Sequence, residues 1–368
     1  MPVLIDRGPH GYCAFGETDR VAVRPRSDVG DVDPRGLDIV LVNNMADQAF
    51  DATERQFLRL LDAAAEDRLV RVALYARANV PRDDWSIRHP IAGDLAFGDV
   101  CSRRPDGLIV TGAEPRPPDL HDEPCWPMLA GLVDWAEHNA VPAIWSCLAA
   151  HAAVHRLDGI GRRTLDDKCF GVFDCQRVAE HALTQGVEWP MRVPHSRWND
   201  VPEQALVAAG YEVLTRSPEA GVDAFVRPGQ SLFVFFQGHP EYQPLTLLRE
   251  YRRDVGRFLK GERATYPALP VAYFDDATTR RLLAFRGRAV ADRRAALIVE
   301  FPLVPAASRW TDAWHTSASR IYRNWLSVLA ERKAALPGPA GSIGAAHDRA
   351  DRVPARWRGC HEGGMKSA

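Results

Sequence analysis

The chain has 368 residues, of which 46% are hydrophobic and 26% are charged, and its formal net charge is −2. This composition is typical of a soluble globular protein, and the small net charge argues against nucleic-acid or membrane-surface binding, because both usually require a concentrated basic face. No apolar run is long enough to cross a bilayer, and the N-terminus lacks a signal-peptide pattern. Seven cysteines without a Cys-x-x-Cys pair disfavour disulfide frameworks and structural zinc sites. We therefore expect a cytoplasmic protein with reduced thiols and no metal.

Alternating strand and helix patterns occupy the first half of the chain. Residues 1–36 are polar and rich in Pro, Gly, Asp and Arg, which predicts an irregular arm. Apolar runs predict strands over 37–43, 70–75, 108–112 and 141–146, and periodic apolar stripes predict helices from residue 53 and over 126–138. This alternation is typical of a doubly wound, mostly parallel α/β sheet of the flavodoxin type.

The pattern changes after Lys168. Short strand-like runs separated by turn residues predict an added β-rich segment; they span 170–178, 191–198, 211–215, 224–227 and 231–236. Helical patterns follow over 244–258, 276–299 and 309–335. The Gly-, Ala-, Pro- and Arg-rich residues 336–368 predict a disordered tail.

Cys147 stands where a predicted strand meets an alanine-rich helix pattern, in Val141-Pro-Ala-Ile-Trp-Ser-Cys-Leu-Ala-Ala-His151. A nucleophile at such an elbow points out of the carboxyl edge of the sheet, where open α/β sheets bind ligands. The helix N-terminus beside it offers N–H donors and a positive dipole end, which favour a thiolate and a developing oxyanion. Taken alone, however, the stretch favours a small buried core cysteine over a nucleophile.

A histidine and a carboxylate follow the last strand of the β-rich segment, in Gly238-His-Pro-Glu-Tyr242. Alternation along an extended chain places His239 and Glu241 on the same side. The carboxylate can then fix the tautomer of the imidazole and support its positive charge, as in Cys-His-acid enzymes. A turn with a surface histidine and glutamate is an equally good interpretation of this stretch alone.

Three segments in this order resemble the homoserine O-succinyltransferase family: Asp106-Gly-Leu-Ile-Val-Thr-Gly-Ala113, the Cys147 elbow and Gly238-His-Pro-Glu-Tyr242. Further matching stretches are Leu41-Val-Asn-Asn-Met45, Lys168-Cys-Phe-Gly-Val-Phe173, Pro194-His-Ser-Arg197 and Asn324-Trp-Leu326. The resemblance covers about 37–326, with an apparent insertion at about 266–311. It implies a class I glutamine amidotransferase-like fold and a single acyltransferase domain over residues 37–335.

The resemblance also implies ping-pong transfer of a succinyl group from succinyl-CoA to the hydroxyl of L-homoserine, in methionine biosynthesis. Cys147 would carry the acyl group as a thioester, His239 would move the protons, and Glu241 would orient His239. The backbone N–H groups of Leu148, Gly112 and Ala113 would form the oxyanion hole. Acyl-CoA is then a co-substrate, no bound cofactor is implied, and relatives suggest a homodimer.

The substrate pocket is expected at five further residues that match family positions. Arg253 would hold the amino-acid carboxylate, because a guanidinium can make a bidentate pair, and Lys168, Ser196 and Arg197 would line the pocket. Arg116 occupies the position associated with acyl choice. A cation there can pair with the free carboxylate of a succinyl group, whereas an acetyl group offers no partner, so we expect succinyl unless Arg116 points to solvent.

Three departures from the family pattern leave alternatives open. The family's Cys-Trp-Gly-Ala-Gln is replaced by Cys147-Leu-Ala-Ala-His151, its Met-Pro-Thr-Lys by Met45-Ala-Asp-Gln48, and the insertion has no counterpart. We expect His151 to pack against the sheet or to line the site. An O-acetyltransferase, or an enzyme for another hydroxy amino acid such as serine, fits these departures. A glutamine amidotransferase-like hydrolase and a non-catalytic binding protein are the remaining alternatives.

Overall fold

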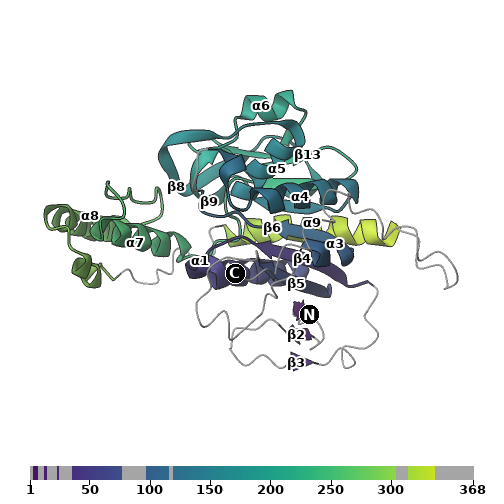
Figure 1. The fold of residues 1–368 in the computed structure, drawn as a ribbon, viewed down its shortest axis with the longest axis horizontal. Coiled ribbons are helices and arrows are strands. Elements are labelled where there is room, and N and C mark those ends of the chain that lie inside the picture. Colours follow the sequence, from purple (N-terminus) through teal and green to yellow (C-terminus); the bar gives the residue numbers. More distant parts are fainter. Residues whose placement is uncertain are drawn as a thin grey trace, which may run out of the picture.

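The computed structural model describes residues 3–6, 12–14, 23–24, 35–76, 97–115, 119–303 and 314–335. Within them, ten strands form a large sheet in the order β10, β13, β14, β7, β6, β4, β5, β1, β2, β3 (Figure 1). In chain order these strands are β1 (Leu4–Asp6), β2 (Tyr12–Ala14), β3 (Val23–Arg24), β4 (Leu37–Asn43), β5 (Val70–Ala76), β6 (Gly107–Val110), β7 (Ala143–Ser146), β10 (Glu212–Val213), β13 (Ala224–Arg227) and β14 (Phe233–Phe236).

The centre of this sheet is parallel. Each neighbouring pair from β14 through β7, β6, β4 and β5 to β1 is parallel, and the pairs beyond both ends are antiparallel. Strand β4, with the sequence LDIVLVN, is apolar nearly throughout because a parallel sheet is covered on both faces. The predicted doubly wound, mostly parallel α/β fold is therefore confirmed.

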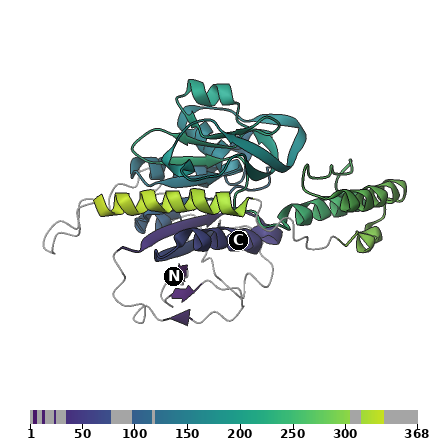
Figure 2. The ribbon, with the colours of Figure 1, turned by 180° about the vertical axis from the view of Figure 1, so that it is seen from behind.

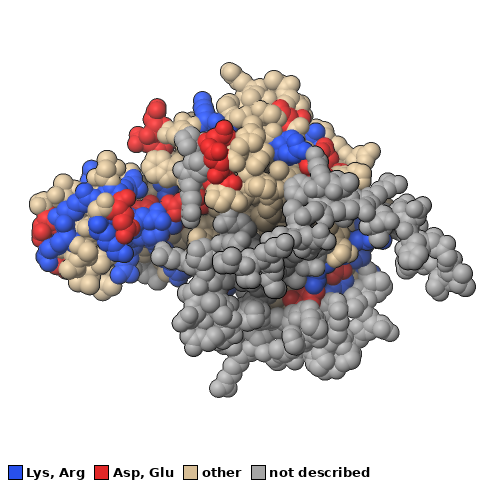
Figure 3. Space-filling model, viewed as in Figure 1, with Lys and Arg blue, Asp and Glu red and all other residues tan. Residues whose placement is uncertain are grey.

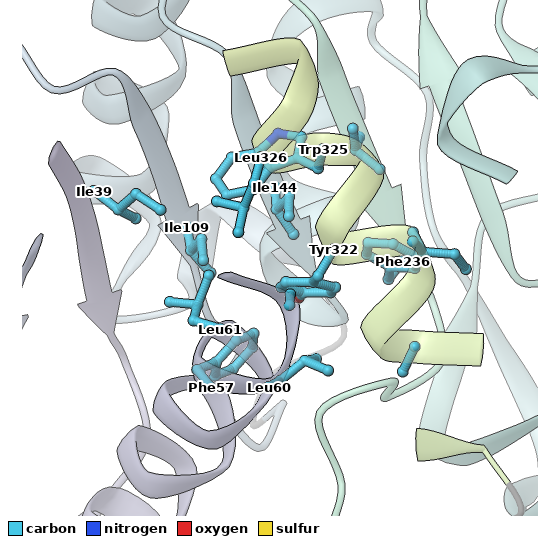
Figure 4. Close-up of a cluster of buried hydrophobic side chains, with 14 of the residues drawn as sticks. Ile39, Phe57, Leu60, Leu61, Ile109, Ile144, Phe236, Tyr322, Trp325 and Leu326 are labelled. Carbon is cyan, nitrogen blue, oxygen red and sulfur yellow. The ribbon is translucent and has the colours of Figure 1, made fainter. Parts of the chain in front are cut away.

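Helices cover both faces of the large sheet. Helices α1 (Asp47–Ala65) and α9 (His315–Ala335) pack on one face, and α4 (Trp126–His138) and α5 (Leu148–Asp158) on the other. Figure 2 shows α9 lying along the sheet, and Figure 4 shows its Trp325 and Leu326 beside Ile144. These three side chains are at most 1% exposed, so removal of apolar surface from water holds this helix on the sheet. The shorter helical segments are α3 (Phe97–Ser102), η3 (Leu120–Asp122), η4 (Ala182–Thr184) and α6 (Glu203–Ala208).

A second sheet is antiparallel and stands beside the end of β14. It has the order β12, β11, β8, β9, with β8 (Arg163–Arg177), β9 (Met191–Asp200), β11 (Thr215–Ser217) and β12 (Gly221–Val222). The backbone N–H of His239, just after β14, donates to the carbonyl oxygen of Pro194 in β9 at 2.8 Å. The predicted β-rich segment thus contributes strands to two sheets.

The strand expected over 211–215 is two strands. Leu214 separates β10 from β11, and these belong to different sheets. The N–H of Leu214 donates to the oxygen of Ala224, whereas its carbonyl accepts from Val178, so the chain passes from one sheet to the other at this residue. A continuous apolar pattern does not reveal such a change of partner, because both sheets bury the same kind of side chain.

Helices α7 (Thr246–Leu259) and α8 (Asp276–Ala291) form an arm that projects from the body (Figure 1). The arm has its own core, in which α7, α8 and η5 (Ala295–Glu300) pack together with Phe170 and Val172 of β8. The helical pattern expected over 276–299 is divided between α8, which ends at Ala291, and the separate 3-10 helix η5. The arm contains much of the stretch expected as an insertion relative to the family. That this stretch is an insertion stays a prediction.

The N-terminal stretch expected to be irregular contains strands. β1 pairs parallel to β5, with Leu4 opposite Arg71, and β2 and β3 extend the sheet from it. The expectation of an irregular arm was wrong for these residues, because strands of two or three residues leave little period in the sequence. Residues 336–368, expected as a disordered tail, lie outside the described residues.

Candidate active site

Cys147 occupies the turn between β7 and α5, as the sequence predicted. Its backbone has φ 52° and ψ −115°, an unfavourable conformation for a residue with a side chain, which costs about 1–3 kcal/mol. Its N–H donates to the carbonyl oxygen of Phe236 at 2.7 Å, and the helix beginning at Leu148 constrains its other side. The surrounding structure therefore enforces the strained elbow, and such strain is typical of a functional position.

The loop at Gly112 closes tightly over this elbow. A Cβ atom at Gly112 would lie 2.8 Å from the backbone nitrogen of Leu148 and 3.2 Å from the Cβ of Cys147. Only glycine permits this approach, because real Cβ atoms essentially never come within 3.0 Å of another heavy atom. The three backbone groups expected to form an oxyanion hole, at Gly112, Ala113 and Leu148, thus line the same cavity as Cys147.

His239 is brought to Cys147 by the pairing of β14 with β7. Phe236 is opposite Ser146 in this parallel pair, so the residues that follow each strand meet at the same edge of the sheet. Nδ1 of His239 lies 2.8 Å from Oε1 of Glu241. The His239 side chain lines the same cavity as that of Cys147. Both His239 and Glu241 are under 10% exposed.

The surroundings of His239 favour its protonated form. Burial lowers the pKa of this imidazole, but the charge of Glu241 and the interaction with Cys147 outweigh burial and raise the pKa well above its usual value. The ring also stacks on Tyr242, with 4.2 Å between ring centroids. His239 is therefore a strong proton acceptor held in one orientation.

A half-buried carboxylate that the sequence interpretation missed, Glu250 of α7, also lines the cavity. It accepts hydrogen bonds from the hydroxyls of Tyr242 (2.5 Å) and Ser196, and Nζ of Lys168 lies 3.4 Å from it. Burial raises the pKa of Glu250, but the Lys168 charge and the two hydroxyl donors lower it below its usual value. One signal could have identified Glu250: it precedes Arg253 by three residues on the same helix face.

The two arginines expected in the pocket differ in their partners. Nε and Nη2 of Arg253 donate to Oδ1 of Asp254 at 3.1 and 3.0 Å, and its side chain is 29% exposed. Arg197 is buried and donates to the backbone oxygens of Asn199 (3.0 Å) and Ala220. Both line the cavity, but the hydrogen bonds of Arg197 tie the second sheet together.

His151, the unexpected residue one turn after Cys147, is 2% exposed. Its Nε2 lies 3.1 Å from Oε1 of Gln237, and that oxygen also accepts from the N–H of Val201. Burial first, and then the charge of Arg197, lower the pKa of His151 to about 3, so the ring is neutral. It lines the cavity, which confirms the second of the two expectations for it.

One cavity of about 770 Å³ unites the predicted site. Its lining contains Gly112, Ala113, Cys147, Leu148, Lys168, Ser196, Arg197, His239, Glu241 and Arg253. Arg116, the remaining predicted residue, lies outside the described residues, although its neighbours Glu114 and Pro115 line the same cavity. The arrangement combines a thiol, a histidine–carboxylate pair and backbone donors in one cavity.

Two absences apply to the part of the chain that the structure describes. It contains no group of three or more His, Cys, Asp or Glu side chains placed to hold a metal ion. None of its helices has the length and apolarity needed to cross a membrane.

Comparison with known proteins gives one consistent family. The family model described as homoserine O-succinyltransferase matches residues 2–335. Homoserine O-succinyltransferase of Rhodopseudomonas palustris is 50% identical over 80% of this chain and 89% of its own, and that of Methylorubrum extorquens is 48% identical over 82% and 89%. Among solved structures, a glutamine amido transferase from Methylobacillus flagellatus aligns with a TM-score of 0.46 and 16% identity, over 84% of this chain and 99% of its own.

Proposed function

This chain belongs to the homoserine O-succinyltransferase family, and we propose that it transfers a succinyl group from succinyl-CoA to the hydroxyl of L-homoserine. The observation that supports this chemistry is a single cavity that contains Cys147 and a histidine whose Nδ1 lies 2.8 Å from a buried carboxylate. That arrangement suits covalent acyl transfer, since it supplies both a nucleophile and a group to move its proton. The relatives' names support homoserine as acceptor and succinyl as the acyl group.

In the first half-reaction, His239 takes the thiol proton and the Cys147 sulfur attacks the thioester carbonyl of succinyl-CoA. The carbon–sulfur bond to CoA then breaks, and His239 returns its proton to the departing thiolate. Acylation removes the interaction with Cys147 that raises the pKa of His239. The imidazolium therefore becomes more acidic just when a leaving group needs its proton.

In the second half-reaction, the homoserine hydroxyl attacks the acyl-thioester while His239 accepts the hydroxyl proton. O-succinylhomoserine leaves, and the sulfur of Cys147 regains the proton from His239. Backbone N–H groups at Leu148, Gly112 and Ala113 are proposed to hold the oxyanion in both halves. The close approach of Gly112 to Leu148 supports this assignment.

The substrate's charged groups face complementary side chains in this proposal. Arg253 would take the amino-acid carboxylate in exchange for its bond to Asp254, because a guanidinium can pair with two oxygens. Lys168, Ser196 and Arg197 complete the pocket as the family resemblance implies. Arg116 is proposed to select succinyl through its free carboxylate.

The test is intact-mass measurement of the protein after mixing with succinyl-CoA without acceptor. We expect a succinyl adduct on Cys147 that disappears when homoserine is added, and no adduct on Cys147→Ala. Acetyl-CoA in place of succinyl-CoA tests the O-acetyltransferase alternative, with Arg116→Ala as the specificity variant. Release of ammonia from glutamine without any adduct would instead establish the hydrolase alternative. Light scattering during gel filtration tests the proposed homodimer.

A further inference from the structure

An open groove of about 2380 Å³ adjoins the cavity that contains Cys147. The two spaces share walls at Met45, Ala113, Glu114, Pro115 and Arg253. The groove runs along α7, and Ala295 and Ile298 of η5 also line it. A long substrate can therefore reach Cys147 with one end while its other end lies on α7.

The groove face of α7 carries a stripe of cations. Arg249, Arg252, Gly256 and Lys260 succeed one another at intervals of three and four residues, which places them on one face of the helix. Arg249, Arg252 and Lys260 are exposed. Figure 3 shows Lys and Arg side chains gathered over the arm that α7 and α8 form.

These three cations lack acidic partners among the residues that the structure describes, unlike their neighbours. Arg253 pairs with Asp254 at 3.0 Å and Arg257 with Glu114 at 2.6 Å, whereas Arg252 lies only over the ring of Phe301. The acids of the groove do not neutralise the stripe. Glu114 pairs with Arg257 and Glu123 with Arg162. Glu262 is then the remaining acid among the described lining residues, and its one negative charge does not balance three positive charges.

Like charges one turn apart on a helix repel each other and destabilise it. A stripe of three such cations beside a catalytic cavity suits a ligand that carries several negative charges. Phosphates fit best, because guanidinium and ammonium groups bind them with charge-assisted hydrogen bonds. The inner cavity already offers Arg253 and Lys168 to the small charged acceptor, so the stripe is available for the larger substrate.

We propose that the groove along α7 binds the phosphates at the nucleotide end of the acyl-CoA donor, through Arg249, Arg252 and Lys260. This inference rests on the proposed function, in which the donor is an acyl-CoA. The pantetheine arm would pass the shared wall at Ala113 and Pro115 and deliver the thioester to Cys147. Gly256, between Arg252 and Lys260, leaves the middle of the stripe free of a side chain.

The test compares a double variant, Arg249→Ala/Lys260→Ala, with the wild-type protein. We expect a ten- to hundredfold rise in KM for succinyl-CoA, and a similar loss in affinity for adenosine 3′,5′-bisphosphate measured by calorimetry. With succinyl-N-acetylcysteamine, a donor without the nucleotide, kcat/KM should change less than threefold. For the wild-type protein, KM for succinyl-CoA should rise with salt, because exposed charges are screened.

The matched control is Arg59→Ala/Arg280→Ala, which removes the same charge from two exposed cations outside the groove, on α1 and α8. It should leave nucleotide affinity at the wild-type value. Equal affinity of wild type, double variant and control for adenosine 3′,5′-bisphosphate would overturn the proposal. Nucleotide binding needs no turnover, so a protein that binds the nucleotide through this stripe but transfers no succinyl group would refute the proposed function alone.

Discussion

The edge of the sheet at Cys147 and the outer face of α7 border one connected space, but they position charge in opposite ways. His239 and Glu241 are buried and bonded to each other at 2.8 Å, next to a cysteine whose backbone is strained. Arg249, Arg252 and Lys260 are exposed side chains on a helix surface. Covalent chemistry requires atoms fixed within a fraction of an ångström, whereas attraction of a polyanion requires only a local positive field. The edge of the sheet at Cys147 should therefore be sensitive to changes of single atoms, whereas the outer face of α7 should tolerate such changes.

The largest effect should come from Glu241→Gln. The amide cannot stabilise an imidazolium, so the pKa of His239 falls and the ring becomes a weaker proton acceptor. We expect kcat to fall by about 10²- to 10⁴-fold with little change in folding. Steady-state kinetics measure this, with a thermal melt to verify the fold. A kcat within threefold of wild type would show that Glu241 does not support His239.

Gly238→Ala should have the next largest effect, because it disturbs packing. A Cβ there would lie 2.5 Å from Oδ1 of Asp223 and 2.6 Å from Cγ1 of Val193, so the residue before His239 must shift. We expect a loss of about 1–3 kcal/mol in the free energy of unfolding, with lower kcat. Gly287→Ala on α8 is the control, because a Cβ there meets nothing within 4 Å. That change should stabilise the protein by roughly 0.5–1 kcal/mol.

Asp223, buried next to Gly238, should make stability depend on pH. Burial raises the pKa of this carboxyl to about 6, although hydrogen bonds from Thr215 and Gly238 oppose that rise. The folded state then holds its proton above the pH at which the unfolded chain releases it. This contribution to stability is complete below about pH 4 and is lost as the pH rises to about 6.

Asp223→Asn should remove that contribution, which is worth roughly 2–3 kcal/mol over the interval. Urea unfolding of both proteins at several pH values between 4 and 7 measures it. The difference between the two free energies of unfolding should change steadily up to about pH 6 and then stay constant. Parallel curves across the whole range would mean that the carboxyl titrates alike in the folded and unfolded chains.

The smallest effect on stability is expected on the helix face. Arg252→Ala removes an exposed side chain with no acidic partner among the described residues, so the free energy of unfolding should change by less than about 0.5 kcal/mol. Chemical denaturation of Arg252→Ala and Gly238→Ala under the same conditions measures the difference between their free energies of unfolding directly. A loss of more than about 1.5 kcal/mol in the free energy of unfolding would mean that Arg252 stabilises the packing of the arm rather than attracting a ligand.

Local sequence patterns were sufficient where a residue's environment depends on its neighbours in the chain. The strand end at Cys147 and the shared side of His239 and Glu241 follow from a strand end and its next few residues, whereas the catalytic role of these residues was expected from the family resemblance. The division of 211–217 between two sheets was not, because the apolar pattern is the same for either partner. Glu250 was missed for a related reason: its partners Lys168, Ser196 and Tyr242 come from three different segments.

The sequence by itself determined the α/β class, the strand that ends at the nucleophile and the family to which the chain belongs. The class follows from apolar periodicity, which is a property of neighbouring residues, and the family follows from three short motifs in a fixed order along the chain. Only the tertiary structure decided that β14 lies against β7, which brings His239 to Cys147. It alone also decided which cations of α7 are paired with acids and which face an open groove. Pairing between distant strands and the neutralisation of charge depend on contacts across the fold, and no local pattern encodes them.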